Sequence, residues 1–409
     1  MLDLVAREGS STPETTGGLV IWGGGPARAA RGRLREGAAV VSWPGADVSR
    51  LQRAGVPFRA VESLLGAEGL AAADGAARGW ARVWGRLPLL DGKSFRELVP
   101  WRGSSLLWNA STFLVEKTAG PRCARMADLA LRLLETTAPS EVDAPGLGPA
   151  EALLLGRACR ARGVLFHGPV PASGRPLATA VPRGGPWRRL AVLLAPSAAP
   201  PLPSPAAGVG LTAPPVVVLV AGAEEGRAVA PLLRAISADL WRSVVPVTLA
   251  ELSRWETRRV HRAVSEAGAF LRALFGRLRG TPGLAESYSH RGVGFADLAA
   301  GDLEALLLGH LPGAVRWIEA AVELFTSTGA AAVLLAVPGP DERRAFVHAC
   351  AASGVGTIVL RLGAPAEGDT TRADGGPQPL AALDWRPGED PEPVVARLRE
   401  AVHGRVGAG

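Results

Sequence analysis

The sequence contains few cysteines and few lysines. Among its 409 residues there are three cysteines and two lysines, Lys93 and Lys117, so every other basic residue except histidine is an arginine. The cysteines are far apart and form no CxxC pair or Cys/His cluster, which argues against a structural zinc site. Cys159 and Cys350 lie in alanine-rich helical patterns, where a free cysteine behaves as a small buried hydrophobe.

Long apolar runs and clustered basic residues are also missing. The most apolar run, residues 190–199, is too short to span a bilayer and leads into prolines. The leader up to about Gly18 is polar and mixed in charge, unlike a secretory signal. Although the net charge is +7, the arginines are scattered and form no dense basic patch. We therefore expect a cytoplasmic protein that binds no nucleic acid, with peripheral membrane association left open.

Strand-like apolar runs alternate with helical segments along most of the chain. Residues 19–22 are apolar, a glycine turn formed by Gly23, Gly24 and Gly25 follows, and an alanine- and arginine-rich segment comes next. This order of strand, turn and helix is typical of parallel βαβ units. Glycines at such a turn let a helix N-terminus approach a phosphate, so these three residues are candidate phosphate ligands. Their spacing is not GxGxxG, and a tight structural turn is the favoured alternative.

Proline divides the chain into two halves. Prolines recur through residues 171–214, which indicates a Pro/Ala-rich linker. An unbroken β-branched run then starts at Val216, as in a buried parallel strand. We predict an α/β protein with a disordered leader at 1–18, a Rossmann-like parallel-sheet unit at 19–170, the linker, and a second such unit at 215–409.

The two predicted units show signs of an internal repeat. An Ala-Cys pair at 158–159 recurs at 349–350, and a Gly-Val pair at 163–164 recurs at 354–355, both at the same offset (349 − 158 = 191 and 354 − 163 = 191). The Arg-Gly pair that starts at Arg102 recurs at Arg291, at nearly that offset (291 − 102 = 189). Matching order at nearly one offset indicates two related units. Because the matched residues are mostly small, chance and the shared physics of one fold are alternative explanations.

Residues 94–134 have the most unusual composition in the chain. They include two tryptophans, Trp101 and Trp108, and a Glu116-Lys117 pair that precedes a Gly-Pro step. The last part of this stretch places apolar side chains at helical spacing. A bulky aromatic pair followed by opposite charges is not the pattern of a plain core helix, so this region is a candidate functional region.

Two stretches of the sequence each resemble part of a known protein family. The run SLLWNASTFLVEKTAGPRCARMADLALRLLE resembles the serine–leucine–tryptophan and glutamate–lysine signature of bacterial surface-carbohydrate biosynthesis proteins, a family of GT-B-like glycosyltransferases. The run YSHRGVGFADLAAGDLEALLLGHLPGAVRWIEAAVELF is similar to the acceptor domain of capsule and lipopolysaccharide glycosyltransferases. In those proteins a later strand typically ends in Gln-His-Gly. Here it ends in Arg-Leu-Gly at 361–363, and the rest of the chain (409 − 363 = 46) is too short for a full donor-binding domain.

The resemblance implies a GT-B-like fold and a role in surface-polysaccharide assembly, with transfer of a sugar from a nucleotide-sugar to a glycan acceptor. Such chemistry requires a base for the acceptor hydroxyl and positive groups for the leaving diphosphate. The nucleotide-sugar is a substrate, no further cofactor is implied, and no DxD motif indicates a metal. Because Gln-His-Gly is missing, one alternative is a non-catalytic relative that binds a glycan precursor or a partner transferase. A further alternative is an unrelated Rossmann-type nucleotide-binding protein, for which the tryptophan–glutamate–lysine match would be a coincidence.

We choose candidate residues for these roles from the resemblance and from side-chain chemistry. Glu116 and His290 are the candidate catalytic bases. The substrate-binding candidates are aromatic and basic: Trp101, Trp108, Lys117, Arg291 and Arg343. Each pair also has a structural interpretation, Glu116-Lys117 as an exposed helix-end pair and His290-Arg291 as ordinary loop residues.

Three further polar residues are interpreted as structural. Asp341 starts a predicted helix, where an aspartate ordinarily accepts a backbone N–H as an N-cap. His310 and His348 lie within predicted helices, so we expect them to be packed or solvated.

Overall fold

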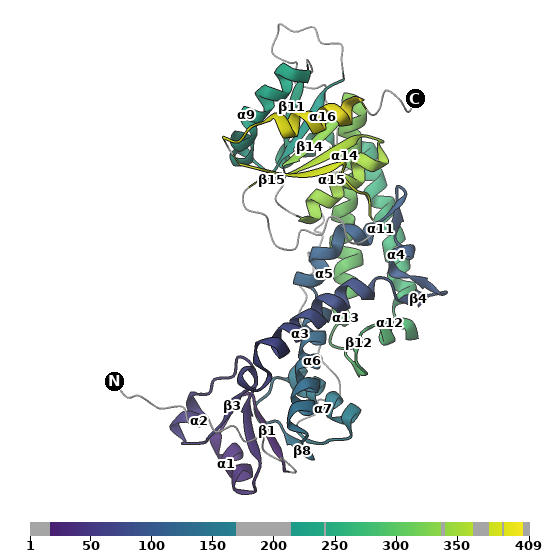
Figure 1. The fold of residues 1–409 in the computed structure, drawn as a ribbon. Helices are drawn as coiled ribbons and strands as arrows, with labels where there is room; N and C mark the ends of the chain where they lie inside the picture. Colours follow the sequence, from purple (N-terminus) through teal and green to yellow (C-terminus); the bar gives the residue numbers. More distant parts are fainter. Residues whose placement is uncertain are drawn as a thin grey trace. The chain divides into compact units, whose positions relative to one another are not determined.

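The computed structural model describes residues 17–168, 214–240, 243–336, 340–362, 376–386 and 388–403. The predicted leader, except for its last two residues, and the predicted linker, except for Pro214, lie outside the described residues. The described residues form a mixed α/β protein with two five-stranded parallel sheets, as the sequence predicts for two Rossmann-like units (Figure 1). No described helix is long and apolar enough to cross a membrane.

The chain forms two compact units, and each includes a segment from the other half of the sequence. Of the described residues, those in 1–80, 119–178 and 285–300 form unit 1, and those in 81–118, 179–284 and 301–409 form unit 2. The boundaries predicted from the sequence differ, because they leave 81–118 in the first unit and 285–300 in the second. Both exchanged segments carry a hairpin that long-range hydrogen bonds attach to its unit, and local sequence patterns do not reveal such bonds.

The parallel sheet of unit 1 has the strand order β3-β2-β1-β8-β9. Its strands are β1 (Leu19–Trp22), β2 (Ala39–Ser42), β3 (Arg59–Ala60), β8 (Glu141–Asp143) and β9 (Leu165–His167). Alternate side chains of β1 and β2 pack with Ala30 of α1 (Ala27–Arg35) and Leu51 of α2 (Ser49–Arg53). Helix α7 (Pro149–Arg162) packs on β9 and on α6 (Gly120–Thr137). Strand β1, in the centre of the sheet, is apolar throughout because both of its faces are buried.

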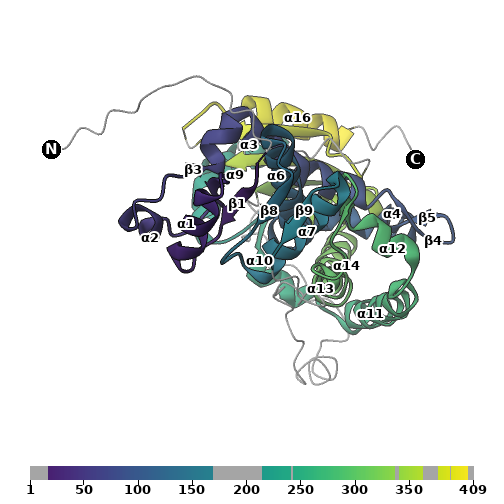
Figure 2. The same ribbon diagram turned by 90° about the horizontal axis from the view of Figure 1, so that it is seen from below.

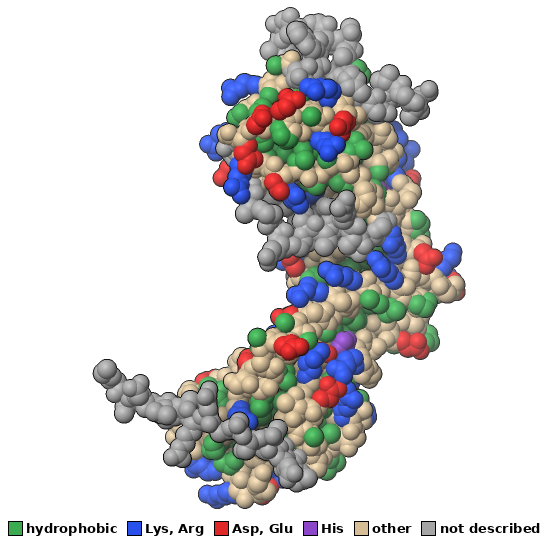
Figure 3. Space-filling model, in the orientation of Figure 1, with side chains coloured by type: hydrophobic (Ala, Val, Ile, Leu, Met, Phe, Trp, Pro, Cys, Tyr) green, Lys and Arg blue, Asp and Glu red, His purple; other side chains and the backbone are tan. Residues whose placement is uncertain are grey.

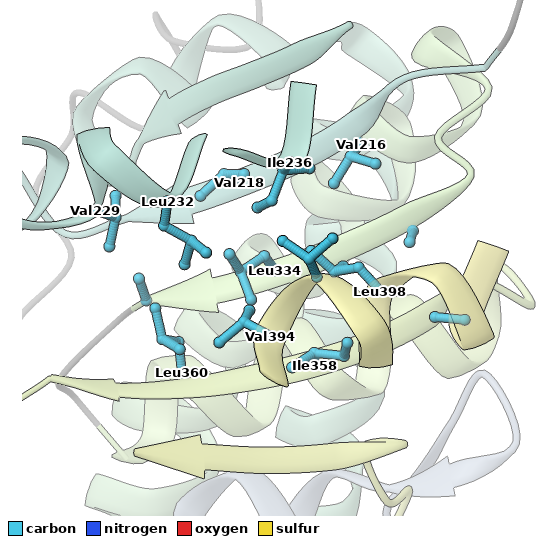
Figure 4. Close-up of a cluster of buried hydrophobic side chains, with 14 of the residues drawn as sticks. Val216, Val218, Val229, Leu232, Ile236, Leu334, Ile358, Leu360, Val394 and Leu398 are labelled. Carbon is cyan, nitrogen blue, oxygen red and sulfur yellow. The ribbon is translucent and has the colours of Figure 1, made fainter. Parts of the chain in front are cut away.

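The parallel sheet of unit 2 has the strand order β11-β10-β14-β15-β16. Its strands are β10 (Val216–Val220), β11 (Val244–Thr248), β14 (Ala332–Ala336), β15 (Gly356–Leu362) and β16 (Ala381–Trp385). Helices α9 (Ala223–Leu240) and α16 (Glu392–His403) contribute Leu232, Ile236 and Leu398 to a core over one sheet face (Figure 4). Helix α15 (Pro340–Ala352) packs against β14 and β15.

The other helices of the described residues complete the two units. Helices α11 (Arg258–Leu278) and α14 (Leu311–Thr328) lie side by side, and Figure 2 views both nearly end-on. Between the two, the chain forms α12 (Pro282–Ser287), α13 (Ala300–Glu304) and a short helix with π-type hydrogen bonds at 305–310. The remaining helices are α3 (Val61–Trp84), α4 (Phe95–Leu98), a 3₁₀ turn at 106–110, α5 (Ser111–Lys117), α10 (Leu249–Leu252) and a 3₁₀ turn at 253–255.

The offset of the internal repeat extends to whole elements. Helices α6 and α14 start at 120 and 311 and end at 137 and 328, so both ends differ by this offset (311 − 120 = 191 and 328 − 137 = 191). The starts of strands β8 and β14 differ by it too (332 − 141 = 191), as do those of β9 and β15 (356 − 165 = 191). The same offset relates Ala138 and Gly329, which end the two helices in the left-handed conformation. The two units therefore share an arrangement, not only a few small residues.

Three short antiparallel hairpins were not predicted from the sequence. They consist of β4 (Pro88–Leu90) with β5 (Lys93–Ser94), β6 (Pro100–Trp101) with β7 (Ser104–Ser105), and β12 (Ser289–His290) with β13 (Val293–Gly294). Each turns at two residues with positive φ, and the second is always a glycine. The interpretation of His290-Arg291 as loop residues is therefore wrong for His290, which ends a strand, and correct for Arg291, which begins the turn.

Candidate functional site

The glycine turn of unit 1 is explained by close packing between two loops. Gly23 donates its N–H to Pro145 O at 3.1 Å. A Cβ atom on Gly23 would lie 2.6 Å from Leu147 Cα, and one on Gly146 would lie 2.0 Å from Gly24 O. The loops that follow β1 and β8 thus meet backbone to backbone, which requires glycine whether or not a ligand binds. A phosphate-binding role for Gly23, Gly24 and Gly25 stays a prediction.

In unit 2 a buried carboxylate holds the hairpin formed by β6 and β7. Glu319 of α14 is 3% exposed and accepts hydrogen bonds from Arg102 Nε at 2.6 Å and Nη2 at 2.7 Å. Trp101 Nε1 donates to the same carboxylate at 2.9 Å. His348 Nε2 donates to Trp101 O at 2.9 Å. We call these four residues the Glu319 clamp, which fixes both the turn and the aromatic ring of the hairpin.

In unit 1 a second buried carboxylate holds the hairpin formed by β12 and β13. Asp128 of α6 is 2% exposed and lies 2.9 Å from His290 Nε2 and 3.4 Å from Arg291 Nη1. Arg157 of α7 donates to Gly294 O at 2.7 Å. We call Asp128, His290, Arg291 and Arg157 the Asp128 clamp.

The two clamps occupy equivalent positions in the repeat. Asp128 and Glu319 differ by the repeat offset (319 − 128 = 191), and so do Arg157 and His348 (348 − 157 = 191). Because an ionised carboxylate can only accept hydrogen bonds, the proton that joins His290 to Asp128 sits on Nε2. His290 thus does in unit 1 what Trp101 does in unit 2, since each donates a ring N–H to the buried acid.

Hydrogen bonds keep Asp128 ionised despite its burial. Burial raises the pKa of its carboxyl, but hydrogen bonds from His290 and from Arg132, at 2.5 Å, outweigh burial and hold the pKa below its ordinary value. Arg291 also bonds to Glu135 at 2.6 Å. The acid therefore serves as a fixed negative centre on which donors from a hairpin and a helix converge.

His348 is fully buried, and its ring is neutral. Burial lowers the pKa of the imidazole, and Asn109 Nδ2 donates to its Nδ1 at 3.1 Å. With Nε2 donating to Trp101 O, both ring nitrogens are used. This confirms the interpretation of His348 as a packed residue, and it leaves no lone pair for proton transfer.

Asp341 caps a helix other than the one predicted. Its carboxylate accepts the N–H groups of Thr112 and Phe113, at 3.2 and 3.1 Å, in the first turn of α5. Arg344, 6% exposed, donates to the same carboxylate at 3.1 Å. The prediction that Asp341 caps its own helix is wrong, because the free N–H groups of α5 lie within reach of the carboxylate. His310 stacks on Phe113 at 4.4 Å between ring centroids.

The other predicted site residues are divided between the two units. Glu116 and Lys117 are exposed at the end of α5, as expected for a helix-end pair, and they belong to unit 2, whereas His290 belongs to unit 1. Trp108 and Arg343 also lie in unit 2, where they are 5% and 7% exposed.

Each unit has a surface hollow. The unit 1 hollow has a volume of about 470 Å³ and lies beside the hairpin that carries His290. Its polar lining includes Arg157, Arg160 and Asp297. The unit 2 hollow is much smaller, about 70 Å³, and its lining is apolar apart from Ser111 and three arginines: Arg82, Arg86 and Arg96.

Sequence reasoning missed the two acids on which the clamps depend. Asp128 and Glu319 each interrupt an apolar run within a predicted helix, between Ala127 and Leu129 and between Ile318 and Ala320. A charged residue on the buried face of a helix needs a partner, and that was the available signal. The identity of the partners was not available from local sequence.

No group of acidic, histidine and cysteine side chains suited to a metal ion occurs among the described residues. No protein-family model matches the chain, and no curated protein matches it.

Proposed function

We propose that the protein binds a sugar precursor in surface-polysaccharide assembly, as a GT-B-like relative of glycosyltransferases that does not itself transfer the sugar. The resemblance stated from the sequence supports the glycan context, and two Rossmann-like sheets agree with a GT-B-like architecture. The observation that carries the proposal is the unit 1 hollow. Its volume of about 470 Å³ lies within the usual range of small-molecule sites, roughly 300–1,000 Å³.

The lining of this hollow suits a hydroxyl-rich ligand. Arg157 and Asp297 form a two-bond ion pair at 2.7 and 2.8 Å, so their orientation is fixed. Arg160 is exposed at the rim and adds further donors. Sugar hydroxyls both donate and accept, so a rigid ion pair beside an exposed guanidinium offers them complementary partners.

The candidate catalytic groups support binding over transfer. His290 Nε2 is used to hold a hairpin, in the same way as the non-titrating Trp101 Nε1 in the other unit. Glu116 is exposed, and no described residue orients its carboxylate. A base needs a fixed position beside its substrate.

A variant that fills the hollow tests the proposal. Gly294 lines the hollow, and a Cβ atom on it would have no neighbour within 4 Å, so Gly294→Leu adds a bulky side chain beside the hollow from an open position. Gly79→Leu, at an equally open glycine of α3, is the matched control. The wild type should be stabilised by a nucleotide-sugar or glycan fragment, by about 2.7 kcal/mol at 100 times its dissociation constant. We expect Gly294→Leu to lose this shift and Gly79→Leu to keep it. No shift with any member of such a panel would reject the proposal.

A second candidate function is catalytic transfer with His290 as base. It is favoured by one observation: Nε2 is held by Asp128, while Nδ1 bonds to no described residue and the ring is 20% exposed. The test is acceptor-dependent release of nucleoside diphosphate. If the wild type releases it and His290→Gln does not, while Trp101→Phe does, the transferase assignment replaces the binding assignment.

A further inference from the structure

The small hollow of unit 2 combines positive charge with an apolar floor. Arg82 and Arg86 lie at and just beyond the end of α3, and Arg96 lies on α4. Leu107 and Leu114 form part of the floor. Figure 3 shows basic side chains (blue) gathered over the region where Figure 1 draws α5, with apolar side chains (green) beside them.

Close packing fixes this floor. A Cβ atom on Gly85 would lie 2.1 Å from Leu107 Cδ2, so the leucine rests directly on the backbone that follows α3. Trp108 is 5% exposed, and Val115 remains 40% exposed at the rim. The hollow therefore has a rigid apolar base and an apolar edge that water still reaches.

The charged residues that line the hollow are all positive. The residues that line the hollow include three arginines and no acidic residue. Each guanidinium has five N–H donors in a planar fork, so an arginine that also bonds to the protein keeps donors for a ligand. Ser111 Oγ lies buried in the wall and bonds to no described residue, which leaves one more polar group there.

The size of the hollow decides what it can hold. A volume of about 70 Å³ is far below the roughly 300–1,000 Å³ of sites that enclose a whole small molecule. It suits one compact anionic group, with the rest of the ligand lying along the exposed apolar rim. Planar guanidinium forks match the oxygens of a phosphate particularly well.

We propose that this hollow binds a phosphate ester that carries an apolar chain. The phosphate lies among Arg82, Arg86 and Arg96, and the chain lies along Leu114 and Val115. The site is separate from the unit 1 hollow, and the inference does not depend on the proposed sugar-precursor function.

Calorimetric titration of the full chain with hexyl phosphate, inorganic phosphate and hexanol tests the site. We expect hexyl phosphate to bind at least tenfold more tightly than inorganic phosphate, and hexanol not to bind. Replacing the three arginines together by glutamine should weaken hexyl phosphate binding at least tenfold. Arg258→Gln, at an exposed arginine of α11 in the same unit, should leave it unchanged. Val115→Ser should weaken the binding of hexyl phosphate and not that of inorganic phosphate.

The outcomes separate the parts of the inference. Absence of hexyl phosphate binding to the wild type, or equal binding by the folded triple variant, would overturn the site. Equal affinity for inorganic and hexyl phosphate would overturn the apolar chain. Sedimentation with phosphatidic acid vesicles that the triple variant loses identifies the ligand as a lipid headgroup. Hexyl phosphate binding without sedimentation identifies it as a free phosphate ester, and both results support the site.

Discussion

The two clamps hold equivalent hairpins with different chemistry. In unit 2, Glu319 is matched to one guanidinium by two hydrogen bonds and receives an indole N–H. In unit 1, Asp128 bonds to the imidazole of His290 and to two arginines, Arg291 and Arg132, and Arg132 lies on the same helix as Asp128. What the two units share is a buried carboxylate at one position of the repeat and a turn arginine that bonds to it, Arg102 or Arg291, whereas the other donors differ. A buried acid can thus keep a structural role while its partners vary.

This comparison changes how the candidate residues are interpreted. From the sequence, His290 is a candidate base and the adjacent Arg291 a candidate substrate-binding residue. Beside Trp101-Arg102, the same pair is one of two solutions to a single problem, the attachment of a hairpin to a helix. A structural role therefore explains His290 without any substrate.

The largest expected effect is that of removing Glu319. Glu319→Ala leaves the guanidinium of Arg102 and the indole N–H of Trp101 without their acceptor. Breaking a buried ion pair costs roughly 3–5 kcal/mol. Because the Arg102 side chain is 31% exposed, we expect a loss of about 3 kcal/mol in the free energy of unfolding, measured by urea denaturation.

The control for this variant lies one turn along the same helix. Glu323 faces Arg259 at 3.8 Å, and that arginine is 66% exposed, so Glu323→Ala should cost less than about 0.5 kcal/mol. A loss of less than about 1 kcal/mol in Glu319→Ala would mean that the clamp does not hold the hairpin.

Removing Asp128 should cost less than removing Glu319. The side chains of Arg132 and Arg291 are 34% and 37% exposed, and Arg291 keeps Glu135, so water and a second acid replace part of the lost interaction. We expect Asp128→Ala to lose about 2 kcal/mol in urea denaturation.

Acid should weaken the same interaction in the wild type. Since the folded pKa of Asp128 lies below its ordinary value of 3.8, the stabilisation is complete above that pH and is lost as the pH falls through the folded pKa. A loss in Asp128→Ala as large as that in Glu319→Ala would contradict the ranking of the two clamps.

The smallest expected effect is a dependence of stability on pH that arises from one residue of the Glu319 clamp. The unit 2 anchor, His348, can titrate, whereas the equivalent Arg157 cannot. Burial lowers the folded pKa of His348, so the unfolded imidazole takes a proton near its ordinary value of 6.5 while the folded one does not. Stability should therefore fall as the pH decreases below 6.5, by at most about 1.4 kcal/mol per pH unit, until the folded pKa is reached.

Urea denaturation at pH 7.5 and 5.5 measures this slope. The variant His348→Gln should show a shallower dependence on pH than the wild type. An unchanged slope in His348→Gln would show that the buried imidazole is not the source of the pH dependence.

Much of the fold follows from local sequence. The apolar spacing before Glu135 predicts α6, Gly163 marks the end of α7, and the aliphatic run at Val216 predicts β10, as the structure shows. The edge strands β3 and β16 were missed, because they are short or partly exposed and lack a continuous apolar run. Two hairpins were missed because Arg102 and Arg291 adopt positive φ, which sequence rules assign mainly to glycine, asparagine and aspartate. The third turns at Asp91-Gly92, a pair typical of such turns, and that signal was overlooked.

The candidate site was less predictable than the fold. The residue types at His290, Arg291 and Trp101 indicated unusual positions, but not what they bind. Asp341 shows the reason: its capping role was predicted, yet the helix that it caps begins at Ser111, in the other half of the sequence. The residue type shows which hydrogen bonds a side chain can make, whereas the fold decides which partner it meets.

The sequence by itself determined the long helices, the central strands and the repeat, because hydrophobic periodicity and capping act over a few residues. Only the tertiary structure decided the exchange of segments between the units, the pairing of each hairpin with a buried acid, and the convergence of three arginines on an apolar floor. These features join residues that are often far apart in the chain, as His290 and Asp128 are (290 − 128 = 162). Their energies depend on burial and distance, which no local pattern specifies.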